Sequence, residues 1–145
     1  MAGDGPASSE LKALAETRGL TDEVVFHGIV RGRALDALFD RADIAVGSLA
    51  MHRIGLEQTS SLKNREYCAR GIPFIAATDD VSFCDANFML RVPEGEAPID
   101  ILSVMNASRD VLSDVVATAR SMRQFAQTQL SWKKRMAEVL DVVGV

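Results

Sequence analysis

The chain has 145 residues, a length that fits one domain, and its 16 basic and 20 acidic side chains give a net charge of −4. This acidic balance argues against a general nucleic-acid binder, which carries a basic excess on one face. A composition of 48% hydrophobic and 25% charged residues is typical of a globular protein with a sizeable core, and no apolar run approaches the ~18 residues of a membrane helix.

The N-terminus lacks the basic region and apolar stretch of a signal peptide. The two cysteines, Cys68 and Cys84, lack the paired spacing of a disulfide scaffold or a zinc site. We therefore expect a cytoplasmic protein with two free thiols.

The first part of the chain alternates helical and strand-like patterns. Residues 3–6 form a Gly-Asp-Gly-Pro turn, and the helix that follows ends at Gly19. A strand is predicted over residues 24–28, a short helix over 35–39 and a buried strand over 44–47. This alternation predicts an α/β domain with a parallel sheet flanked by helices.

A polar loop over residues 48–60 leads into a predicted helix over 61–70. Gly71 is expected to end this helix in the left-handed conformation. Strands are predicted over residues 74–77 and 88–92, and helical patterns follow from residue 99 to the end. The last helix carries one apolar stripe, made of Trp132, Met136, Val139, Leu140 and Val143.

We interpret residues 1–145 as a single Rossmann-like domain whose first strand is largely missing. A glycine-rich turn like that of residues 3–6 normally follows a central strand, so we expect Met1 to lie inside or just after that strand. With the strand order 3-2-1-4-5, the missing strand would lie between residues 24–28 and 74–77. Both neighbours would then expose unpaired backbone groups, and the chain would tend to associate.

Hydroxyl residues open the predicted helix over 61–70, and Lys63 follows in its first turn. Free N–H groups and the helix dipole favour an anion at this end, whereas a lysine opposes the dipole. A bound phosphate would reconcile the two features. The alternative is an ordinary Ser61 cap with a solvated lysine.

Glu66 lies on the same predicted helix, with Lys63 three residues before it and Arg70 four residues after it. This spacing is typical of a surface ion pair worth a few tenths of a kcal/mol. The alternative is a carboxylate that accepts hydrogen bonds from sugar hydroxyls beside the phosphate site. Physical chemistry alone does not choose between these two interpretations.

Several segments, in order and near the expected spacing, resemble the C-terminal half of GT-B glycosyltransferases of the retaining group-1 (family 4) type. The similarity covers about residues 3–92, and residues 130–143 are similar to the closing helix of the family. The matching patterns are Gly3-x-Gly5-Pro6, Val24-x-Phe26-x-Gly28, Asp43-Ile44-x-Val46 and Lys63-x-x-Glu66-Tyr67-x-Ala69-x-Gly71-x-Pro73.

The resemblance implies a domain that binds a nucleoside-diphosphate sugar. Glu66 matches the glutamate that hydrogen-bonds the donor ribose, and the amides around Ser61 and Leu62 match those that hold the diphosphate. The remaining matches are Ile29 and Val30 beside the base, and Gly3 and Gly5 in the turn that approaches the donor. The family usually needs no bound metal and no cofactor.

Two departures from the family pattern concern the transferred sugar and the leaving group. The first glutamate of the usual pair stands eight residues before the second, where this chain has Gln58 with Glu57 beside it. Glu57 and Gln58 are thus the candidates near the transferred sugar. The basic pair that neutralises the leaving diphosphate lies upstream in the family, and Lys63 is a partial substitute for it.

Other polar residues offer weaker signals. His52 and Arg53 lie in the loop where the family places sugar-facing residues, whereas His27 fits an ordinary packed or surface histidine. The acidic residues Asp79, Asp80 and Asp85 follow a predicted strand, where acids commonly form caps and turns rather than a metal site.

The sequence leaves two functions open. The first is the donor half of a glycosyltransferase that transfers a sugar with retention to a glycan or lipid-linked hydroxyl, inactive without its N-terminal acceptor domain. Any peripheral membrane association would come through that other half, and no nucleic acid is expected as a partner. The second is a non-catalytic GT-B-like nucleotide-binding or interaction module. A phosphoacceptor domain is disfavoured, because residues 24–28 and 44–47 carry no terminal aspartate.

Overall fold

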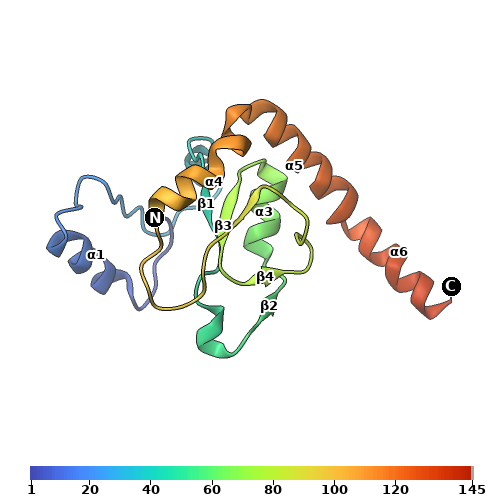
Figure 1. The fold of residues 1–145 in the computed structure, drawn as a ribbon, viewed down its shortest axis with the longest axis horizontal. Helices are drawn as coiled ribbons and strands as arrows, with labels where there is room; N and C mark the ends of the chain where they lie inside the picture. Colours follow the sequence, from blue (N-terminus) through green and yellow to red (C-terminus); the bar gives the residue numbers. More distant parts are fainter. Residues whose placement is uncertain (145) are drawn as a thin grey trace. The chain divides into compact units, whose positions relative to one another are not determined.

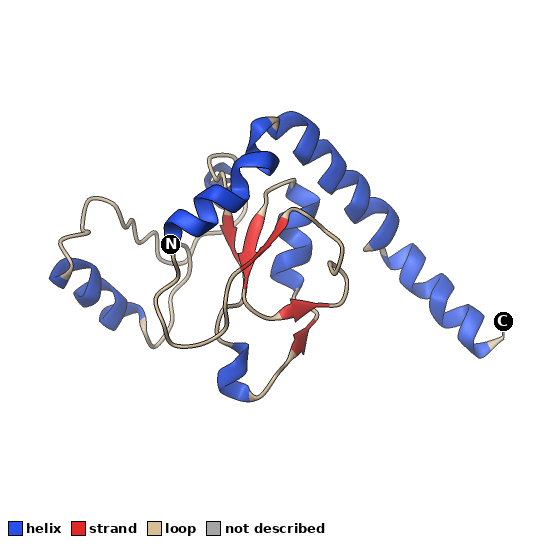
Figure 2. Cartoon of the chain, in the orientation of Figure 1, coloured by secondary structure: helices blue, strands red, loops and turns tan. Residues whose placement is uncertain are grey.

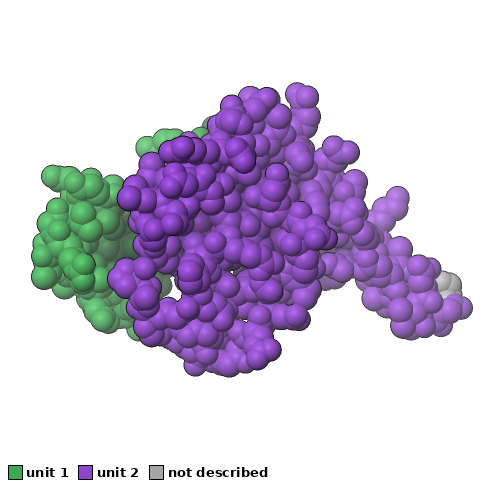
Figure 3. All heavy atoms as spheres, in the orientation of Figure 1, with its two compact units in different colours: residues 1–41 green, residues 42–145 purple. Residues whose placement is uncertain are grey.

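The computed structural model describes residues 1–144, which fall into two compact units. One unit comprises residues 1–41 and the other comprises the rest of the chain from residue 42 (Figure 3). Each unit has its own secondary structure. None of the helices in residues 1–144 is long and apolar enough to cross a bilayer.

The first unit contains helix α1 (Ser8–Thr17) and helix α2 (Arg33–Phe39). The strand predicted over residues 24–28 does not form as a regular strand. Its backbone nevertheless bonds to the chain start: His27 N donates to Met1 O at 2.9 Å, Gly3 N donates to Gly28 O at 2.7 Å, and the Met1 ammonium donates to Val25 O. This is the pattern of a parallel pair, too short to count as a sheet.

The main sheet of the second unit has three parallel strands, β1 (Ala45–Val46), β3 (Phe74–Ala76) and β5 (Met89–Arg91) (Figure 2). Strand β3 is central, with Phe74 opposite Ala45 on one side and opposite Met89 on the other. The strand order predicted from the sequence is therefore wrong at this point, because residues 74–76 are paired on both sides. All three residues of β3 are buried, as expected for an interior strand.

A second, two-stranded sheet lies within the segments predicted as loops. Strand β2 (Gln58–Thr59) pairs in parallel with β4 (Asp79–Asp80), and a 3₁₀ turn, η1 (Met51–Ile54), precedes β2. The polar sequences of these strands carry no hydrophobic alternation, which is why the sequence did not predict them.

Four helices complete the second unit: α3 (Leu62–Arg70), α4 (Ile101–Ser113), α5 (Val115–Gln129) and α6 (Trp132–Val143). The first three pack on the sheet or on each other, whereas α6 extends away from the sheet (Figure 1). The predicted helix over 61–70 is confirmed, and so is its end at Gly71, which has φ +80°.

The side chains of β3 divide the core into two layers. Phe74 joins an aromatic cluster with Phe83, Phe88 and Phe125, in which ring centroids are 5.4 to 6.5 Å apart. Its neighbour Ile75 points to the other layer, which consists of Leu90, Val92 and Val111. Successive strand residues face opposite sides, so both faces of β3 are covered.

Candidate functional site

The start of helix α3 is the centre of the candidate site, and a buried carboxylate already occupies part of it. Ser61 precedes the helix, and its side chain makes no capping bond. Its backbone N–H instead donates to Asp80 Oδ2 at 3.2 Å. The same carboxylate accepts from Asn64 Nδ2 at 3.2 Å and from Ser82 N at 3.1 Å, and Asp80 is fully buried.

The small sheet places Asp80 at this position. Strand β4 runs parallel to β2 with Thr59 opposite Asp80, and α3 begins three residues after Thr59. A carboxylate at a helix N-terminus is stabilised by the free N–H groups and by the helix dipole. Asp80 therefore satisfies the amide of Ser61, one of the groups that the sequence analysis assigned to a diphosphate.

The next amides of the first turn belong to Leu62 and Lys63, at positions where a helix leaves its N–H groups without an intrahelical acceptor. Leu62 is 81% exposed, and Lys63 is exposed as well. This turn follows β2 directly, at the carboxyl end of a parallel strand, where α/β proteins usually bind ligands. An anion thus has two amides and one ammonium group available here.

Glu66 lies one turn further along α3 and is about half exposed. Its carboxylate pairs with Arg70, four residues on, at 3.1 Å. This is the surface ion pair that the spacing predicts, and it leaves carboxylate oxygen surface accessible to another donor. The neighbouring Tyr67 donates its hydroxyl to Val46 O at 3.0 Å, which ties α3 to the end of β1. Burial raises the pKa of Tyr67, with Glu66 adding to the effect.

The candidates near the transferred sugar lie on strand β2 or beside it. Gln58 is in the strand, opposite Asp79, and Glu57 precedes it. Both side chains are exposed. Their role remains a prediction.

The other predicted donor-binding residues belong to the first unit. Ile29 is 67% exposed and follows Gly28, which has φ +64°. Val30 is half-buried. Gly3 has φ +123°, and neither Gly3 nor Gly5 has an atom within 4 Å of an added methyl group. These features are consistent with an open turn, and the assignment to the base and the donor remains a prediction.

His52 and Arg53 form an ion-pair cluster with Glu96, a residue that the sequence did not single out. Arg53 Nε donates to Glu96 Oε1 at 2.7 Å, its Nη2 donates to the other carboxylate oxygen, and His52 Nε2 lies 3.1 Å from Oε1. These bonds hold the pKa of Glu96 at about 2, well below its ordinary value. No local pattern signals this contact, because the partners are more than 40 residues apart.

Asn64, on the buried face of α3, is a second residue that the sequence did not single out. Its side chain is fully buried, and its Oδ1 has no hydrogen-bond partner among the described residues. A methyl group added to Gly47 would lie 2.8 Å from this oxygen and 2.8 Å from Ile75 O. Gly47 thus allows α3 to approach the end of β1 closely, a role that only glycine can fill there.

Two of the three aspartates considered for a metal, Asp79 and Asp80, have different partners. Asp79 forms an ion pair with Arg91, and the Asp80 carboxylate accepts the three N–H bonds described above. Within residues 1–144, no three His, Cys, Asp or Glu side chains are grouped so that they could hold a metal ion.

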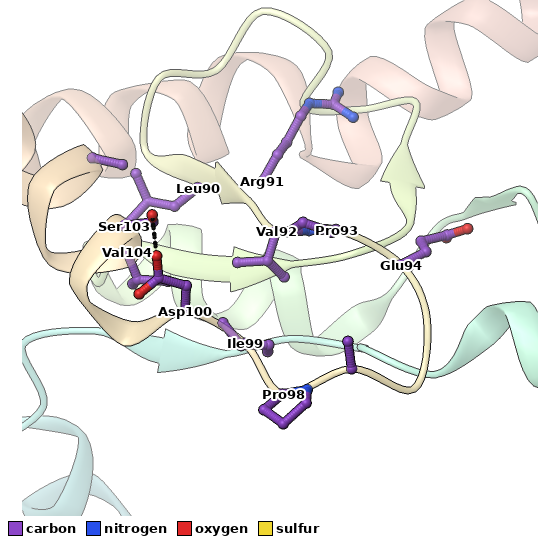
Figure 4. Close-up of a pocket in the computed structure, with 12 residues that line it drawn as sticks. Leu90, Arg91, Val92, Pro93, Glu94, Pro98, Ile99, Asp100, Ser103 and Val104 are labelled. Atoms are coloured by element: carbon purple, nitrogen blue, oxygen red, sulfur yellow. Dashed lines mark hydrogen bonds between the residues drawn. The ribbon is translucent and has the colours of Figure 1, made fainter.

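A cavity of about 360 Å³ lies beside the end of β5 and the first turn of α4 (Figure 4). Its wall is mostly apolar, with Val92, Pro98, Ile99 and Val104 among its lining residues. Asp100, the one acid that caps α4, accepts from Ser103 Oγ at 2.6 Å and from Leu102 N at 3.0 Å, and its pKa is lowered as a result. Because this carboxylate already has its partners, the cavity offers few free polar groups.

Comparisons with known proteins add no relative. A scan against protein-family models gave no match, and a search of curated proteins returned no similar sequence. The structure itself shows an α/β architecture, with small parallel sheets flanked by helices.

Proposed function

We propose that this chain is the donor-binding half of a retaining GT-B glycosyltransferase, which holds a nucleoside-diphosphate sugar at the start of α3. The observation that carries the proposal is the exposed first turn of α3, directly after a parallel strand, with Lys63 and Glu66 both exposed on the helix that follows. Anions bind at such helix starts because free N–H groups and the dipole act together. The sequence motifs quoted above supply the second line of support.

In this proposal the described residues bind and orient the donor. The amides of Leu62 and Lys63, with the Lys63 ammonium, hold the diphosphate, and Glu66 accepts hydrogen bonds from the ribose hydroxyls. Asp80 keeps the Ser61 turn in place rather than contacting the donor. In this proposal an N-terminal domain recognises the acceptor and completes the cleft, and no metal takes part.

A thermal-shift panel of UDP, GDP, ADP and their sugars tests the proposal directly. A ligand that binds the folded chain stabilises it by RT ln(1+[L]/Kd), about 2.7 kcal/mol at a hundredfold excess over Kd. One nucleotide of the panel should raise the melting temperature in a saturable manner. No shift with any nucleotide at millimolar concentration would contradict the proposal.

The variant Glu66→Ala identifies the ribose contact. Loss of a charge-assisted hydrogen bond of ~1.5–3 kcal/mol should raise the donor Kd about 10- to 150-fold. The free energy of unfolding should change by only a few tenths of a kcal/mol, because the pair with Arg70 is exposed. Calorimetric titration measures the affinity, with Glu10→Ala on α1 as the control. An unchanged Kd would return Glu66 to the role of a surface ion pair.

One observation favours a second function, a nucleotide-binding module without transferase activity. Gln58 replaces the first glutamate of the family pair, and it lies in a strand that is paired with β4. The reading frame upstream of Met1 distinguishes the two functions. A frame that continues into a second Rossmann domain supports the enzyme, whereas a stop codon supports the separate module.

A further inference from the structure

Two arginines from different helices converge on one hydroxyl oxygen in the second unit. Arg65 on α3 donates from Nη2 to Ser82 Oγ at 2.8 Å, and Arg135 on α6 donates from Nη2 to the same atom at 3.1 Å. Ser82 lies in the turn that follows β4. The cluster of Arg65, Ser82 and Arg135 is called the two-arginine cluster below.

The charges of this cluster are only partly balanced. Arg135 pairs with Glu138 at 3.0 Å, but Arg65 has no carboxylate partner in the described part of the chain. Its other bond goes to the carbonyl oxygen of Ser61 at 3.3 Å. Asp80 faces the cluster through the Ser82 N–H, yet its carboxylate is buried and already accepts three N–H bonds. Two guanidinium groups therefore meet at a neutral oxygen, where an anion would relieve their repulsion.

We propose that the two-arginine cluster binds a phosphate group, as inorganic phosphate or as a small phosphomonoester. Guanidinium groups bind phosphate through paired N–H donors. The Ser82 hydroxyl, which now accepts from both arginines, turns to donate its own proton to a phosphate oxygen. Three donors from three segments suit a tetrahedral anion better than a planar carboxylate, which one guanidinium fork satisfies alone. The Arg135 side chain is 42% exposed, so an anion can reach it.

This site is separate from the proposed donor site. Arg65 follows Lys63 by two positions on α3, and residues two apart point to different sides of a helix. The cluster also joins α6 to the rest of the unit, since Arg135 reaches across to the turn after β4. A phosphate held by both arginines would therefore fasten α6 to α3.

Titration calorimetry of the whole chain tests the proposal, with inorganic phosphate and glycerol phosphate at constant ionic strength. Arg65→Gln and Arg135→Gln should each weaken phosphate binding at least tenfold, and Ser82→Ala should weaken it a few-fold. Arg120→Gln, which removes an exposed arginine of α5, should change the affinity less than twofold. Lys63→Ala, measured in parallel, tests for phosphate bound at the start of α3 instead. A nucleotide bound at the donor site should leave phosphate binding unchanged, so the two proposals fail independently. A preference between the two ligands tells whether the free ion or the ester is the natural occupant.

Three results would overturn the proposal. One is the absence of saturable phosphate binding to the unaltered chain at millimolar concentration. Another is an equal loss of affinity in Arg120→Gln, which would indicate general charge attraction. The third is a loss in Lys63→Ala without a loss in Arg135→Gln, which would place the phosphate at the start of α3. If Arg65→Gln does not fold, the phosphate affinity of Arg135→Gln, on the projecting α6, decides whether the cluster binds phosphate.

Discussion

Asp80 is the residue on which the geometry of the candidate site depends most. Its carboxylate joins the turn before α3, the buried Asn64 and the turn after β4 through three hydrogen bonds of 3.1 to 3.2 Å. A buried carboxylate is costly unless N–H donors surround it, and here they do. The residue therefore stabilises the turn that the proposed function needs.

Replacing Asp80 with alanine should lower the free energy of unfolding by about 3 kcal/mol, because three N–H groups lose their acceptor in the interior. The neighbouring Asp79 is a matched control, since its side chain is 52% exposed and pairs with Arg91 at the surface. Asp79→Ala should cost less than about 1 kcal/mol. Urea denaturation of both variants measures the difference. Equal losses of unfolding free energy in the two variants would show that the hydrogen bonds of Asp80 contribute little to stability.

Glu96 illustrates a residue whose charge state depends on two distant partners. The hydrogen bond from Arg53, followed by that from His52, lowers its pKa from 4.5 to about 2. A lowered pKa stabilises the folded form above the unfolded value and loses that effect as the pH falls through the folded value. The stability that Glu96 gains from its contact with η1 should thus be complete above about pH 4.5 and be lost between there and about pH 2. A carboxyl NMR titration measures this pKa, and Arg53→Gln should return it toward 4.5.

Among the elements, the packing of α3 against α5 depends on Gly71. The residue ends α3 with φ +80°, and a methyl group added to it would lie 2.8 Å from Ala119 Cβ and 2.9 Å from Ala119 O. On the same face of α3, three residues earlier, the Cys68 thiol donates to Met122 O of α5 at 3.2 Å. Burial raises the pKa of this thiol to about 12. Helix α3 is therefore fixed at its C-terminal end by close contact with α5.

The variant Gly71→Ala should destabilise the chain by roughly 3 kcal/mol, through strain at positive φ and collision with the α5 backbone. Gly55 is a suitable control because it has a similar φ of +70° but no atom within 4 Å of an added methyl group. Gly55→Ala should cost only about 1 kcal/mol, the effect of the backbone conformation alone. Thermal and urea unfolding compare the two variants. Equal costs would mean that α5 moves aside easily.

At the scale of the whole molecule, helix α6 leaves its apolar stripe uncovered. Trp132 is 82% exposed, and Met136, Val139 and Val143 are 49 to 61% exposed. The helix itself and the stripe along it are as the sequence predicts. Exposed apolar surface of this kind favours association with other apolar surfaces.

We expect the purified chain to associate as its concentration rises. Val139→Glu combined with Val143→Glu should restore a monomer, because both charges fall on the exposed stripe. The melting temperature should change little, since these side chains make few contacts within the chain. Size-exclusion chromatography with light scattering measures the mass. A monomer for the unaltered chain at all concentrations would contradict this expectation.

The sequence by itself determined the identity of most elements. Apolar spacing predicted α1, α2 and α6, a helical pattern from residue 99 covered α4 and α5, and the apolar run Phe74-Ile75-Ala76 predicted a buried strand. Gly71 marked the end of α3, because a left-handed residue is a local requirement of the chain. The separation of four residues on one helix predicted the ion pair between Glu66 and Arg70. All of these depend on neighbours within about one or two helical turns.

The tertiary structure alone decided how distant segments meet. It placed β3 between β1 and β5, it paired the polar strands β2 and β4, and it brought Asp80 to the start of α3. It also joined His52 and Arg53 to Glu96, and Arg65 and Arg135 to Ser82. These partners are separated by 15 or more residues, and no local periodicity records such pairs. Strand order and buried polar contacts are set by packing of the whole unit, since only there does a carboxylate lose water and require the N–H groups of another segment.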